Sequence, residues 1–68
     1  MARIRVHVIP VREEWLVEEE GHHVTTYRAR NQAETFARQE ARRVGGDLIV
    51  HGFDGRVMWT CRYARGRE

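Results

Sequence analysis

Residues 31–46, with the sequence NQAETFARQEARRVGG, decide the fold because they carry the signals that start, continue and end an α-helix. Asn31 is predicted to be the N-cap, since its side-chain oxygen can accept a hydrogen bond from a free N–H of the first turn. Glu34 follows three residues later, where its carboxylate can reach back to the cap. Gly45 and Gly46 are predicted to end the helix, because glycine adopts the left-handed conformation without steric cost.

An apolar stripe recurs at helical spacing within this segment, and most of its members are small. The stripe consists of Ala33, Phe36, Ala37, Ala41 and Val44. Small side chains allow a helix to lie close to a flat surface. We therefore predict that this helix packs on a β-sheet.

Runs rich in β-branched residues flank the helix on both sides and predict four strands. We place these strands at residues 3–10, 15–19, 47–52 and 57–63. The dipeptide Asp54-Gly55 lies between the last two runs and indicates a hairpin turn. Residues 22–30 lack a helical period and are predicted to form an extended connector into the helix.

The predicted fold is therefore α+β, in the order β-β-α-β-β, with a four-stranded antiparallel sheet of order 2-1-3-4 and the helix packed on one face. A right-handed crossover through the helix places the third strand beside the first. The predicted core face consists of Ile4, Val6, Val8, Trp15, Val17, Leu48, Val50, Val57 and Trp59. Residues 1–63 are expected to form a single small domain, and residues 64–68 a frayed tail.

Length and composition limit the possible functions. A chain of 68 residues buries only about 60% of its unfolded surface, so extra stability is expected to come from a disulfide, a metal or a partner chain. Cys61 is the only cysteine, which excludes an internal disulfide and fits a cytoplasmic protein. No signal peptide or membrane-spanning run is recognisable. All 12 basic residues are arginines, but 10 carboxylates nearly balance them, so charge alone does not indicate a nucleic-acid binder.

The sequence resembles a known family at several points. These are His7-Val8-Ile9-Pro10, Trp15 five residues later, the alanine-rich helix, and above all Val50-His51-Gly52 followed by Asp54-Gly55-Arg56. Together they resemble the bacterial and archaeal family called domain of unknown function 2188 (DUF2188), over roughly residues 5–63. Met58-Trp59 departs from the polar residues usual in the family after the Asp-Gly turn. The resemblance supports the fold and implies no activity.

The face of the sheet opposite the helix is the main candidate for an interaction surface. It is predicted to carry Arg3, Arg5, His7, Leu16, Ile49, His51, Arg56, Met58, Thr60 and Arg62. Exposed apolar residues on one patch suggest a protein–protein surface, and a homodimer or another protein partner covering this face would also relieve the small core. The first prediction is thus a non-catalytic binding or assembly module that associates with itself through the open face.

A nucleic-acid-associated protein is the alternative prediction. Arginines on the sheet face resemble the arrangement in single-strand binders, although good stacking platforms are aromatic. In this interpretation Arg38, Arg42 and Arg43, on the edge of the helix, contact phosphates.

Metal and enzyme functions are not predicted. His7 and His51 are expected to lie side by side on the open face, but two imidazoles fall short of the four ligands of a closed zinc site. No catalytic spacing and no glycine-rich phosphate loop stands out. Cys61 is interpreted as a small buried hydrophobe and Asp54 as a turn residue. No cofactor is expected.

Overall fold

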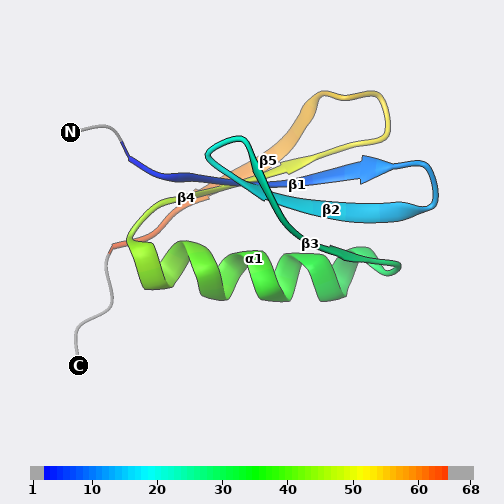
Figure 1. The fold of residues 1–68 in the computed structure, drawn as a ribbon. Coiled ribbons are helices and arrows are strands. Elements are labelled where there is room, and N and C mark those ends of the chain that lie inside the picture. The colour runs from blue at the N-terminus through cyan, green and yellow to red at the C-terminus, as the bar shows by residue number, and fades with distance from the viewer. Residues whose placement is uncertain (1–2, 65–68) are drawn as a thin grey trace.

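The computed structural model describes residues 3–64, which form a five-stranded sheet with one helix on one face (Figure 1). The elements are β1 (Arg5–Val11), β2 (Glu14–Glu19), β3 (His22–Tyr27), α1 (Arg30–Val44), β4 (Asp47–His51) and β5 (Val57–Arg62). The strands lie in the order β3-β2-β1-β4-β5. β1 and β4 run parallel, and the other neighbouring strands run antiparallel.

The predicted four-stranded antiparallel sheet of order 2-1-3-4 is wrong, because the segment taken for a connector forms β3. Glu20 (φ 54°) and Gly21 (φ 83°) form a two-residue turn that folds β3 back onto β2. This extra reversal changes the direction in which the chain enters α1. The crossover therefore places β4 beside β1, as predicted, but the two strands run parallel and not antiparallel.

Helix α1 confirms the predicted stripe and corrects the predicted start. Ala33, Ala37 and Ala41 are fully buried against the sheet. The helix ends at Gly45, which adopts the left-handed conformation with φ 67° and ψ 41°. It begins after Ala29, which makes no side-chain cap.

The predicted cap residues lie inside the first turns of α1. The Asn31 carbonyl accepts a hydrogen bond from the Thr35 hydroxyl, and Glu34 forms an ion pair with Arg30 at 3.4 Å. The Glu34 carboxylate, which was predicted to reach the cap, is therefore engaged with Arg30 one turn earlier in the helix.

The core lies between α1 and the central strands, as predicted for most of its members. Val6, Val8, Trp15, Val17, Leu48 and Val50 are buried, and Ile4 is half-buried. The assignments of Val57 and Trp59 to the core are wrong, since these side chains are 53% and 38% exposed. Within the described residues the backbone of α1 lies close to β1 to β4 and not to β5, so the edge strand lies largely beyond the cover of the helix.

A β-bulge in β5 exchanges the predicted orientations of Val57 and Met58. The pairing shifts by one residue between Val50 and His51, so that Val50 pairs with Trp59 and His51 pairs with Val57. Val57 thereby shares the face of His51, away from the helix. The Met58 sulfur instead lies 4.0 Å from the Arg30 guanidinium of α1. An extra residue in one strand reverses the alternation of every side chain beyond it.

Of the tail predicted at 64–68, residues 65–68 lie outside the described part of the structure. In the described part, no helix has the length and apolar character needed to cross a membrane.

Candidate functional site

The face of the sheet opposite α1 bears no second layer within residues 3–64 (Figure 1). We call it the open face. Side chains alternate along each strand, and the registers fix which residues share a face. Eight of the ten predicted residues lie there: Arg3, Arg5, His7, Leu16, Ile49, His51, Thr60 and Arg62. Ile9 and Glu18 share the same face through their pairing with Leu16 and His7.

The centre of the open face is apolar. Ile9 on β1 pairs with Leu16 on β2, and Ile49 on β4 lies beside His7. All four side chains are half-buried. A hollow of about 150 Å³ lies next to this centre and is lined by Asp47, Ile49, Thr60, Cys61 and Arg62. This volume is below the roughly 300–1,000 Å³ of small-molecule pockets, so the hollow suits a single protruding side chain.

Two histidines meet at this centre, as their strand positions predict. The His7 Nδ1 atom lies 2.9 Å from His51 Nε2, and the rings are stacked with centroids 5.1 Å apart. The second nitrogen of His51, Nδ1, lies 3.3 Å from the Gly55 carbonyl in the β4–β5 turn. Burial, followed by the neighbouring His51, lowers the pKa of His7 from its usual 6.5, and Glu18 partly opposes this shift.

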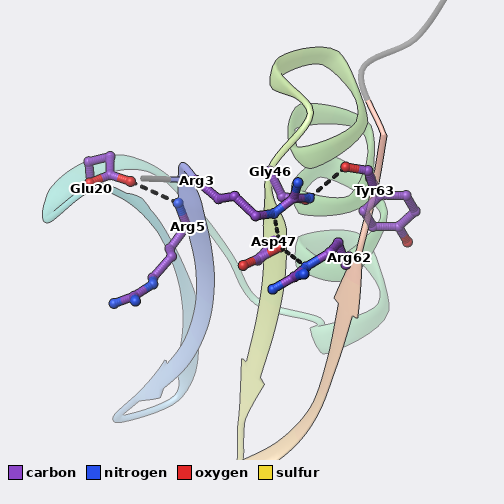
Figure 2. A network of polar contacts seen from close by, with 7 residues as sticks. All are labelled: Arg3, Arg5, Glu20, Gly46, Asp47, Arg62 and Tyr63. Carbon is purple, nitrogen blue, oxygen red and sulfur yellow. Dashed lines mark hydrogen bonds and ion pairs between the residues drawn. The ribbon is translucent and has the colours of Figure 1, made fainter. Parts of the chain in front are cut away.

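A polar network borders the open face where β1 and β4 begin and β5 ends (Figure 2). The Arg3 guanidinium donates to the Asp47 carboxylate at 2.6 Å, and to the backbone carbonyls of Gly46 and Tyr63 at 3.1 and 2.6 Å. Arg62 donates to the same carboxylate at 3.3 Å. Three segments that are far apart in the sequence are thereby joined at one corner of the sheet.

The carboxylate of Asp47 is held in its ionised form by this network. The hydrogen bond from Arg3 is the largest influence that lowers the pKa of Asp47, and the charges of Arg3 and Arg62 act in the same direction. A second contact at this border is the Arg5 N–H, which donates to a Glu20 side-chain oxygen at 2.8 Å (Figure 2). The charged groups therefore border the apolar centre at the end of the sheet where β1 and β4 begin.

Two predicted members of the surface lie elsewhere. Arg56 belongs to the β4–β5 turn, where its N–H donates to the Asp54 side chain at 3.0 Å and its guanidinium is 87% exposed. Asp54 thus acts as the turn residue that the sequence predicts. Met58 is turned toward Arg30 by the bulge, as described above.

The three helix arginines of the alternative prediction do not form a continuous set of free cations. Arg43 is paired with Glu40, and its Nε lies 3.1 Å from that carboxylate. Arg38 is half-buried and faces Tyr63, where its charge opposes the rise that burial and the Cys61 thiol cause in the pKa of Tyr63. Arg42 is exposed in the last turn, near the helix C-terminus where a cation is favourable.

An apolar cluster that the sequence patterns did not reveal lies at the other end of the sheet, on the side of α1. The Phe53 ring lies 5.3 Å from the Trp15 ring, and the Arg30 guanidinium stacks 5.8 Å above Trp15. Phe53 is 81% exposed and Met58 46%. The orientation of Met58 toward α1 could not be predicted, because the alternation of residue types does not reveal a β-bulge.

The described residues do not gather a metal centre, since no three His, Cys, Asp or Glu side chains lie close enough to hold an ion. Two further surface hollows lie away from the open face. One of about 310 Å³ lies between Tyr27 and Phe36, and one of about 430 Å³ lies beside Arg12 and Arg28 at the β1–β2 turn. The site that the structure assembles is thus a partly apolar surface.

Comparison with known proteins supports the family that the sequence motifs suggested. No curated protein and no solved structure matches the chain. Residues 6–63 match the family described as "Uncharacterized protein conserved in bacteria (DUF2188)", and this range contains all six elements except the first residue of β1. The chain therefore belongs to the DUF2188 family.

Proposed function

We propose that the protein is a non-catalytic assembly module that associates with a second copy of itself through the open face. The observation that carries this proposal is the apolar centre of Ile9, Leu16 and Ile49 on a sheet face that has no covering layer within the described residues. An apolar centre surrounded by a polar rim is the usual anatomy of a protein–protein interface. Isologous two-fold dimers are the commonest closed assemblies.

The distribution of charge on the open face favours a second copy as the partner. Glu18 lies on β2, to one side of the central strand β1, and Arg62 lies on β5, on the other side. A two-fold axis along β1 sets the Glu18 side of one copy against the side of the other that carries His51 and the Arg62–Asp47 ion pair. Two sheets that pack face to face in this way keep their strands within about 30° of each other.

The small core of the monomer gives a second reason for self-association. Three of the buried apolar residues are alanines, which contribute little apolar area each. A chain of this size is marginally stable alone. Covering Ile9, Leu16 and Ile49 would add apolar burial at about 25 cal/mol per Å².

The proposal is tested by the mass of the full chain in solution, measured by light scattering over a range of concentrations. The wild-type chain is expected to show a concentration-dependent mass that reaches a dimer. Thr60→Glu adds a charge at an exposed position beside Ile49 and is expected to give a monomer. Ile49→Glu is the stronger second variant, and circular dichroism verifies that each variant is folded.

Met58→Glu provides the matched control, because Met58 is also apolar and exposed but lies on the side of α1. We expect this variant to remain a dimer. A wild-type chain that stays monomeric at all concentrations contradicts the proposal. So does dissociation by Met58→Glu without dissociation by Thr60→Glu, which would move the interface to the cluster around Phe53.

Nucleic-acid binding has weaker support, because Arg3, Arg43 and Arg62 are engaged with carboxylates. If it occurs, binding of a labelled DNA or RNA oligonucleotide must weaken steeply as salt rises. Arg42→Glu, at the exposed end of α1, is then expected to weaken it further.

A further inference from the structure

The hydrogen bonds of the histidine pair define which nitrogen carries each proton. A carbonyl oxygen only accepts, so the His51 Nδ1 atom at 3.3 Å from the Gly55 carbonyl must be the donor. In a neutral imidazole the other nitrogen, Nε2, is then an acceptor. The His7 Nδ1 atom at 2.9 Å therefore donates to it. His51 is neutral in this arrangement, and when His7 is neutral as well its Nε2 keeps a free lone pair.

Protonation changes this pair in two steps. A first proton on His7 Nε2 leaves both hydrogen bonds in place but adds a charge to the centre of the open face. A second proton on His51 Nε2 removes the acceptor and sets two cations against each other across 2.9 Å. Both steps disfavour covering the pair with another protein surface, since a charge that loses its water is penalised.

The charged groups around the pair come from three neighbouring parts of the fold. Glu18 on β2 faces His7 across the strand pair, and Glu20 follows in the β2–β3 turn; both favour the cation. Arg5 on β1 opposes it, as does His51 on β4. The residues that β5 places beside Ile49 and His51 are Thr60 and Val57, which carry no charge. Burial, His51 and Arg5 together outweigh the two carboxylates, so the surroundings favour the neutral form of His7.

We propose that the His7–His51 pair makes self-association through the open face depend on pH, with the dimer favoured while both imidazoles are neutral. This inference rests on the proposed function, because the pair lies within the surface assigned to the dimer. Each copy must release its proton to be covered, and a dimer covers two such pairs. Below the pKa of His7, each proton that is released costs about tenfold in the dimer equilibrium per pH unit.

The test is sedimentation equilibrium of the full chain between about pH 8 and about pH 5.5, at constant ionic strength, a range in which unperturbed carboxylates stay ionised. We expect the dimer dissociation constant to rise several-fold as pH falls across this range, since the lowered pKa of His7 places its titration toward the acid end. His7→Asn and His51→Gln, made together, keep polar groups that do not titrate. This double variant is expected to show the same dissociation constant throughout the range.

His22→Gln is the matched control, since His22 pairs with Glu19 on an exposed edge strand and is not part of the pair. It is expected to keep the wild-type pH dependence. If the double variant fails to fold, wild-type dissociation followed together with the histidine ring signals in NMR decides the question. The dimer must dissociate over the pH range in which the ring signals of His7 shift.

The pH dependence and the dimer itself are overturned by different results. A wild-type dimer whose dissociation constant is the same at both ends of the pH range overturns the pH dependence and leaves the proposed function intact. A pH dependence that survives in the double variant also overturns it. A chain that is monomeric even at about pH 8, where histidine is neutral, overturns the proposed function and this inference together.

Discussion

Gly46 lies where α1 passes into β4, and its backbone is too close to its neighbours to tolerate a side chain. A Cβ atom at this position would lie 2.2 Å from the Ile4 carbonyl oxygen. That oxygen also accepts the Asp47 N–H at 2.8 Å, so it cannot move away without losing a hydrogen bond of the sheet. The glycine is needed here for space, whereas Gly45 next to it is needed for its left-handed backbone.

We predict that Gly46→Ala destabilises the fold by at least about 3 kcal/mol, because a rigid backbone clash belongs to the severe class of substitutions. Gly55→Ala is the control. Gly55 has φ +85° and open space around it, so alanine there costs only about 1–2 kcal/mol of backbone strain. Urea unfolding followed by circular dichroism measures both values. Equal losses would contradict the close approach to Ile4.

At the same corner, Asp47 links stability to pH. Its pKa is lowered in the folded chain, chiefly by the hydrogen bond from Arg3. The contribution of the carboxylate is therefore present above its unfolded pKa and is lost as pH falls through the lower folded pKa. We predict that Asp47→Asn lowers the urea midpoint at neutral pH and that the difference from wild type shrinks below pH 3.8, its usual value. A difference that does not change with pH would contradict this account.

Among the elements, α1 shows why a helix of small residues covers this sheet. Ala33, Ala37 and Ala41 are fully buried, so the backbone of the helix lies close to β1, β2 and β4. Because these side chains are short, the helix covers only the strands directly beneath it and leaves β5 largely uncovered. At the other edge, Phe36 of α1 lies near Tyr27 of β3, with ring centroids 6.0 Å apart.

We predict that Ala37→Leu destabilises the fold by about 1–3 kcal/mol, because the added methylene groups force the helix away from the sheet. Gln39→Leu introduces the same side chain at an exposed position of α1 and is expected to change stability by less than about 0.5 kcal/mol. Chemical denaturation of both variants measures the difference. A stable Ala37→Leu variant would indicate a loose contact between helix and sheet.

Helix α1 and strand β2 also share a pair of carboxyl groups. Glu19 on β2 is half-buried beside Glu40 of α1. Burial, followed by this neighbour, raises the pKa of Glu19, whereas the hydrogen bond from Arg43 lowers the pKa of Glu40. The helix and the second strand are thus coupled by a carboxyl pair whose two members titrate differently.

For the whole molecule, the proposed dimer predicts that stability depends on protein concentration. Dimerisation stabilises the folded state by mass action, and a tenfold rise in concentration is worth about 0.7 kcal/mol per chain. We predict that the Tm at about pH 8, where the histidines are neutral, rises by roughly 3–6 °C for each tenfold rise in concentration. Calorimetry at several concentrations measures this, and a constant Tm would indicate a monomer. Thr60→Glu is expected to abolish the dependence.

The sequence alone determined the local features of this protein. The alanine stripe, the glycine stop at Gly45, the Asp54-Gly55 hairpin and the alternation of Val6 and Val8 are set by residues that are near neighbours in the chain. Their physical causes are side-chain size and backbone freedom, which act within a few residues. The meeting of His7 and His51 was also predictable, because strand parity fixed the face and the crossover fixed the neighbours.

Only the tertiary structure decided the features that depend on pairing between distant segments. Residues 22–27 have a mixed pattern, and their strand exists because β2 offers a free edge after the Glu20-Gly21 turn. That strand in turn made β4 parallel to β1. The bulge that exchanged Val57 and Met58 is a property of the β4–β5 pairing and of neither strand alone. The pattern of residue types indicates which side chains favour burial, whereas the register between strands determines which of these side chains are buried.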